Sequence, residues 1–224
     1  MNNNAKRLLG KAIDIIDSKP AKVLDFLVDL SECVMGISDQ IFFDTFETYI
    51  LTLVGYNHEN GEYDQDILND FSEALADAVS NNQSEYAGDI DKGREYAVRI
   101  IKIIDDCGTK TKAVYMSNLT RAFIIHKIQL NNFFKLARCI CNLTEEDLVF
   151  IKNHISEDVV NEEAEYYEDF QSQGLMSLRA GGYIYTTRAF LLRNYALAYE
   201  EKEIWPTKDI SGRTADFRAG WGTF

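Results

Sequence analysis

Apolar residues recur three and four positions apart along most of this chain, which is the period of a helix with one buried face. The densest region runs from Leu119 to Ile155, where three apolar segments follow one another with almost no polar spacer. Such a region is stable in water only if other segments cover it, because large uncovered apolar patches drive association. We therefore expect it to form the centre of a helical core.

The flanking sequence repeats the same pattern and predicts further helices. These are expected over residues 5–16, 21–36, 65–80 and 95–106, with one capped by Ser38 or Asp39 that ends before Gly55 and one that starts after Thr109. The chain contains only two prolines, Pro20 and Pro206, so long stretches are free to be helical. Residues 80–93 are polar and contain glycines, which is typical of a connector.

An acidic stretch, GYNHENGEYDQD, occupies residues 55–66 between two of these helices. Aligned as an EF-hand, it places Tyr56 and Ile67 where calcium ligands are required, so the calcium pattern fails. We expect a solvated loop. The order of helix, acidic glycine-containing turn and helix resembles a tellurite-resistance TerB-type domain over a short part of the chain.

The last third of the chain changes character. Thr144 with Asp147 predicts a capping box at the start of a helix that ends near Ile155, and a second helix is expected over residues 157–173, ended by Gly174. Residues 175–178 and 183–186 then flank Arg-Ala-Gly-Gly, which predicts a small β-hairpin whose glycines supply positive φ. Thr187 is expected to cap a helix through Tyr199.

These elements together predict a mainly α protein. We expect a multi-helix bundle with a C-terminal winged-helix-like part that contains one small β-hairpin. The predicted boundaries are 1–142 for the helical core domain, 143–201 for the winged-helix-like subdomain and 202–224 for an irregular aromatic tail.

The C-terminal order of helix, helix, hairpin and helix resembles a MarR-like winged helix. The matching pieces are LTEEDLVFIKNHI, YYEDFQSQGLMSL and GGYIYTTRAFLLRNYAL. The resemblance implies DNA binding through the helix at 157–173, but this segment is rich in Asp and Glu and has no Lys or Arg. DNA affinity depends on neutralising phosphates, so the charge has the wrong sign. The nearby positive charges are Arg179, Arg188 and Arg193.

Composition narrows the class of partner. The net charge is −13 at pH 7, which repels nucleic acid and anionic membranes and favours a basic protein partner. No window approaches the roughly 18 uncharged apolar residues of a spanning helix, and the N-terminus does not look like a secretory signal. We expect a cytoplasmic protein. A small, acidic, Asn-rich helical chain is similar in style to proteins of phages and mobile elements.

The residues that usually carry chemistry form no recognisable motif. Serine-hydrolase, zinc-protease, Walker and dinucleotide-binding patterns are all absent from the sequence, so no catalytic residue and no cofactor are predicted. Cys33, Cys107, Cys139 and Cys141 lie in or beside apolar segments, which predicts reduced, buried thiols. The three histidines are scattered, so no metal site is predicted.

We predict a non-enzymatic protein-interaction factor, such as an accessory or counter-defence protein of a phage or mobile element. Its candidate partner-binding residues are acidic side chains of the predicted helix and aromatic side chains of the tail: Glu162, Glu163, Glu165, Glu168, Asp169, Trp205, Trp221 and Phe224. Homo-oligomerisation stays open. One alternative is a transcriptional regulator that contacts DNA through Arg179, Arg188 and Arg193. Another is an enzyme or small-ligand receptor with a site between helices.

The tail interpretation has a direct test. Deleting residues 203–224 should leave a folded protein that loses its partner or its oligomeric state, because large rigid rings are effective interface anchors. Circular dichroism measures folding, and light scattering with a pull-down measures assembly. An unchanged solution mass together with an unchanged pull-down would contradict the prediction.

Overall fold

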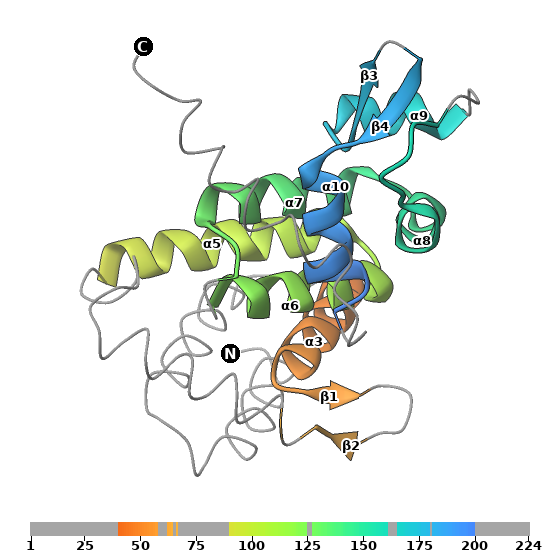
Figure 1. The fold of residues 1–224 in the computed structure, drawn as a ribbon. Helices are drawn as coiled ribbons and strands as arrows, with labels where there is room; N and C mark the ends of the chain where they lie inside the picture. The colour runs from red at the N-terminus through yellow and green to blue at the C-terminus, as the bar shows by residue number, and fades with distance from the viewer. Residues whose placement is uncertain are drawn as a thin grey trace. The chain divides into compact units, whose positions relative to one another are not determined.

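Figure 1 shows the computed structural model of the chain, which describes residues 40–57, 62–64, 66, 90–124, 127–160, 165–179 and 181–199. The chain divides into two compact units, Met1–Asn142 and Leu143–Phe224. The helices predicted over 5–16 and 21–36 lie outside the described residues, as does the helix over 65–80 except for Asp66. The predicted three-part division, with a separate tail after residue 201, stays a prediction.

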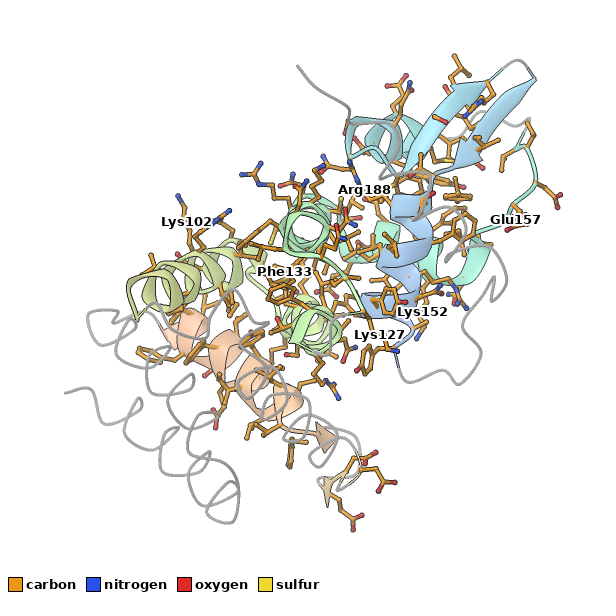
Figure 2. The ribbon with its side chains drawn as sticks, turned by 60° about the vertical axis from the view of Figure 1, so that its left-hand side comes forward. Lys102, Lys127, Phe133, Lys152, Glu157 and Arg188 are labelled. Atoms are coloured by element: carbon orange, nitrogen blue, oxygen red, sulfur yellow. The ribbon has the colours of Figure 1, made fainter. Side chains whose placement is uncertain are left out.

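The N-terminal unit is built from four described helices that pack on one another (Figure 1): α3 (Gln40–Leu53), α5 (Ile90–Cys107), α6 (Lys110–Ile124) and α7 (Leu130–Asn142). Along α3, the rings of Phe42, Phe46 and Tyr49 stack in succession, because positions three and four apart lie on one helix face. Phe133 of α7 is fully buried, and Figure 2 shows it in the interior among the helices.

The interface between α3 and α6 contains buried polar groups as well as apolar ones. The Tyr49 hydroxyl donates to Thr120 Oγ1 over 3.1 Å, and the Ser117 hydroxyl donates to the Tyr49 carbonyl over 2.7 Å. Thr120 in turn donates to the Met116 carbonyl over 2.8 Å. Burial raises the pKa of Tyr49, so the phenol stays protonated and remains a donor. These directional bonds fix how the two helices align.

The turn from α5 to α6 agrees with the sequence. Gly108 follows α5 with φ +70°, and Thr109 Oγ1 accepts a hydrogen bond from the Lys112 amide over 3.4 Å. The start of α5 differs from the prediction, because residues 90–93 of the predicted connector are helical. Lys92 and Arg94 favour a helix without adding to an apolar stripe, which is the signal that the prediction relied on.

The C-terminal unit begins with α8 (Glu145–His154), where the predicted capping box is confirmed. The Thr144 side chain accepts from the Asp147 amide over 3.1 Å, and the Asp147 carboxylate accepts from the Thr144 amide over 3.0 Å. The unit continues with α9 (Glu165–Ser172), β3 (Met176–Arg179), β4 (Gly182–Tyr185), α10 (Thr187–Leu192) and a π-helical turn, η1 (Arg193–Leu197).

The predicted β-hairpin is confirmed to within one residue at each end. Strands β3 and β4 are antiparallel, and the register pairs Met176 with Tyr185 and Leu178 with Tyr183. Gly181 and Gly182 have φ of +111° and +137°, a region that residues with a Cβ avoid. The hairpin lies beside α9 (Figure 1).

The predicted helix over 157–173 is wrong in its first part. Residues 156–159 form a turn, in which the Ser156 hydroxyl accepts from the Asp158 amide, and Val160 then forms an antiparallel bridge with Tyr183 of β4. The bridge uses both Val160 backbone groups, at 2.8 and 2.9 Å, so this residue cannot join a helix. β-branched Val160 also suits the extended conformation.

Two smaller expectations also change. Thr186, and not Thr187, is the N-cap of α10, and its hydroxyl donates to the Gly174 carbonyl over 2.7 Å instead of capping the helix. The expected solvated loop at 55–66 contains two short strands, β1 (Tyr56–Asn57) and β2 (Glu62–Tyr63), which pair antiparallel. The register pairs Tyr56 with Tyr63 and Asn57 with Glu62.

The mainly α fold with a small β-hairpin is confirmed. The apolar region 119–155 is divided between the two units, with the end of α6 and α7 in the N-terminal unit and α8 in the C-terminal unit. Leu148 and Ile151 of α8 are buried, and α8 packs on η1. Among the described helices, none has the length and hydropathy needed to cross a membrane.

The polar contact between α3 and α6 can be tested with a double-mutant cycle. Thr120→Val removes the acceptor and leaves the Tyr49 hydroxyl buried without it, so the free energy of unfolding should fall by about 1–3 kcal/mol. Tyr49→Phe should cost about 1 kcal/mol. The loss in the double variant should be smaller than the sum of the two single losses by at least about 1 kcal/mol. Urea unfolding measures the free energy of unfolding of each variant. Strict additivity would show that the bond contributes nothing.

Candidate functional site

The most distinctive surface among the described residues is the acidic face of α9, held in place by an aromatic cluster. Tyr167 and Phe170 are buried, and the Tyr167 ring packs on Tyr183 of the hairpin at 5.4 Å between centroids. Glu168 and Asp169 fall between these positions in the sequence and are exposed. Burying the rings therefore turns the two carboxylates to solvent.

The same cluster ties α9 to α8. The Phe150 ring lies 4.2 Å from Tyr166 and 4.3 Å from His154, centroid to centroid. The His154 ring stacks on Phe150, and its Nδ1 lies 3.1 Å from the Phe150 carbonyl oxygen. These aromatic pairs hold α9 against a neighbouring helix, so the acidic face belongs to a helix that is packed on its neighbour.

The C-terminal end of α9 is closed by a basic side chain from α10. The chain leaves the helix through Gly174 at φ +68°, and the Leu175 amide donates back to the Phe170 carbonyl over 2.7 Å, as in a Schellman motif. Arg188 Nη1 donates to the Gln173 carbonyl over 2.6 Å. Its positive charge lies at the negative end of the helix dipole. Figure 2 shows Arg188 on α10.

Arg193 has the same role at the end of α8. Its Nε donates to the Lys152 carbonyl over 3.0 Å, in the last turn of that helix, and its Nη1 approaches Asn194 Oδ1 at 3.4 Å. Of the three arginines that a DNA-binding function would use, Arg188 and Arg193 therefore bond to backbone carbonyls within this unit. Arg179 ends β3 and is exposed.

The structure separates the predicted acidic residues. Glu168 and Asp169 lie on the exposed face of α9, and Glu165 is the first residue of this helix. Glu157, which was expected in the same helix, is exposed in the preceding turn, and Figure 2 shows it pointing away from the unit. The remaining predicted contacts lie outside the described residues: Glu162, Glu163, Trp205, Trp221 and Phe224.

A second cluster, in the N-terminal unit, was missed by the sequence reasoning. Cys107 ends α5 and Cys141 lies one residue before the end of α7, and their Sγ atoms are 2.8 Å apart. The Lys112 ammonium, at the start of α6, donates to the Cys141 carbonyl over 2.9 Å. Lys112 is only 9% exposed, so its charge acts in a partly desolvated setting.

The two thiols have different acidities. The hydrogen bond from Cys107 lowers the pKa of Cys141, and the nearby Lys112 charge acts in the same direction, while burial and Asp106 oppose it. The same hydrogen bond, together with burial, raises the pKa of Cys107. Cys141 is therefore the more acidic of the two thiols. The described residues contain no group of three or more His, Cys, Asp or Glu side chains that could hold a metal ion.

The sequence held one weak signal of this pair. Cys139 and Cys141 stand one residue apart on an amphipathic helix, so their side chains diverge, and only Cys139 is within the apolar core at 2% exposure. Nothing in the spacing shows that Cys141 meets a cysteine 34 positions earlier.

Comparison with protein-family models, with curated proteins and with solved structures gives no match.

The closure at Gly174 can be tested against a matched glycine. A Cβ at Gly174 would clash with Arg188 Nη1, whereas a Cβ at Gly108 would meet nothing within 4 Å, although the two φ values, +68° and +70°, are alike. Gly108→Ala should cost about 1–2 kcal/mol from backbone strain. Gly174→Ala should cost about 1 kcal/mol more, because Arg188 must leave the helix end.

Urea unfolding measures both variants. When Arg188 is replaced by Met, Gly174→Ala should lower the free energy of unfolding only as much as Gly108→Ala does, because the backbone strain remains and the clash with Arg188 is gone. Equal losses for Gly174→Ala and Gly108→Ala in the wild-type background would show that Arg188 does not close the helix.

Proposed function

We propose that this chain is a protein-interaction factor that binds a basic partner through the exposed acidic face of α9. The observation that carries the proposal is the contrast within one unit. Glu168 and Asp169 are exposed, whereas the Arg188 and Arg193 guanidinium groups donate to helix carbonyls. A partner that approaches α9 therefore meets carboxylates backed by a rigid aromatic cluster.

Complementary charges mainly speed up association and select the partner, and they contribute less to the binding free energy. A stable complex therefore also needs an apolar contact. The hairpin beside α9 offers one. Leu178 is 62% exposed and lies opposite Tyr183, which packs on Tyr167 of α9. Val159, next to the residue that bridges to Tyr183, is 45% exposed. A basic partner with an apolar side chain among its cations would match this surface.

The DNA-binding alternative is less well supported. Phosphate contacts need Arg or Lys side chains that can reach the nucleic acid. Using Arg188 or Arg193 in this way would remove a hydrogen bond from the end of α9 or α8. The phage or mobile-element origin rests on sequence style, and no described contact bears on it.

The proposal can be tested by reversing the charge at two matched pairs of exposed acidic residues. A fluorescent decapeptide of alternating Lys and Leu serves as the basic, apolar probe, and anisotropy at several salt concentrations measures its dissociation constant. Replacing Glu168 and Asp169 together by Lys should weaken binding by about tenfold or more. The control replaces Asp105 and Asp106 of α5, both exposed, by Lys.

The two double variants change the net charge equally, so a non-specific attraction would weaken both alike. A selective loss with the α9 variant supports the proposed surface. Equal losses would overturn it, and so would wild-type protein that does not bind the probe at low salt.

A further inference from the structure

The Cys107 and Cys141 sulfur atoms are close together, and both residues lie at helix ends. The sulfur atoms are 2.8 Å apart, although 34 positions separate the residues in the chain. A disulfide bond is about 2.05 Å long, so a small closing movement brings the two sulfurs to bonding distance. Each thiol lies at the end of a helix, where a short displacement of the backbone disturbs few hydrogen bonds.

The two thiols also differ in their exposure to solvent. Cys107 is 3% exposed, while Cys141 is partly exposed, so a small reagent from solvent meets Cys141 first. The Lys112 ammonium favours negative charge on this sulfur, and the Asp106 carboxylate opposes it. When Cys141 is protonated, its thiol donates to the Ile103 carbonyl over 3.4 Å.

We propose that Cys107 and Cys141 form a redox-active thiol pair, which a small hydroperoxide such as hydrogen peroxide oxidises to an intramolecular disulfide between α5 and α7. Cys141 is the residue that reacts with the peroxide, and Cys107 is the residue that resolves the product. This inference is independent of the partner-binding face on α9.

In the first step the Cys141 thiolate attacks one peroxide oxygen. An S–O bond forms and the O–O bond breaks, so Cys141 becomes a sulfenic acid. The leaving hydroxide takes a proton from solvent and departs as water. Sulfur loses two electrons, and the peroxide gains them.

In the second step the Cys107 sulfur attacks the Cys141 sulfur. The S–S bond forms, the S–O bond breaks, and the departing oxygen leaves as water with the Cys107 proton. Overall, two thiols and one peroxide give one disulfide and two waters. Oxidation of Cys141 removes the thiolate that raises the pKa of Cys107, so the resolving thiol becomes easier to deprotonate once it is needed.

The disulfide would have a structural effect. It would join the ends of α5 and α7 and enclose α6 in a covalent loop, because α6 lies between them in sequence. Closing a loop of this length restricts the unfolded chain. We expect the oxidised protein to melt roughly 5–15 °C higher than the reduced protein.

The test exposes the full-length reduced protein to stoichiometric hydrogen peroxide and then alkylates free thiols before digestion. Trypsin should release Cys107 in the peptide 103–110 and Cys141 in the peptide 139–152. We expect these two peptides to be linked. Because the second peptide also contains Cys139, the experiment is repeated with Cys139→Ala, a matched control two residues away on α7 that should leave the link unchanged.

Two further variants separate the roles. In Cys107→Ala the Cys141 sulfenic acid should persist and be trapped by dimedone. In Cys141→Ala the remaining Cys107 thiol should react with peroxide about tenfold or more slowly than Cys141 does in Cys107→Ala. Melting curves of the reduced variants show that each is folded before oxidation. A link through Cys33 or Cys139, a link only between molecules, or equal peroxide rates in Cys107→Ala and Cys141→Ala would overturn the proposal.

Discussion

The carbonyl groups at helix C-termini constrain much of this structure. The last four carbonyls of a helix have no partner within it and carry the negative end of its dipole. Neither α7 nor α9 has a basic residue in its last turn. Lys112 donates to the Cys141 carbonyl of α7 from another helix, and Arg188 donates to the Gln173 carbonyl after α9 in the same way.

Arg193 extends this arrangement to α8, where it donates to the Lys152 carbonyl. The chain has 23 Lys and Arg residues against 36 Asp and Glu residues, so each cation that turns to a helix end leaves the surface more negative. The cations that satisfy the helix ends therefore add to the acidity of the exterior. The contrast on which the proposed function depends is that Glu168 is exposed whereas Arg188 is bonded to a carbonyl at the end of α9.

Local signals in the sequence predicted local structure well. The Thr144–Asp147 capping box, the hairpin at Gly181–Gly182 and the end of α5 at Gly108 each depend on residues within a few positions of one another. Prediction from the sequence failed where a distant segment forms hydrogen bonds with residues that were expected to be helical. Val160 is drawn from the expected helix by a bridge to Tyr183, 23 positions away, and no local pattern reports that partner.

The candidate sites follow the same rule. Exposure of Glu168 and Asp169 follows from helix periodicity once the buried rings of α9 are known, so the sequence could place them. The roles of Arg188 and Arg193 could not be foreseen, because a guanidinium that reaches a helix end 15 or 41 positions away has no signature in sequence. Both residues therefore resembled surface cations.

Lys112 shows how one contact can have two consequences. Its ammonium is held by the Cys141 carbonyl, and this fixes a positive charge beside the Cys141 sulfur. The Cys107 thiol supplies the hydrogen bond that dominates the acidity of Cys141, but that bond exists only because α5 and α7 end side by side. A chain with net charge −13 would in general disfavour thiolates. The Cys107 hydrogen bond, assisted by the Lys112 cation at the end of α7, reverses that tendency at Cys141.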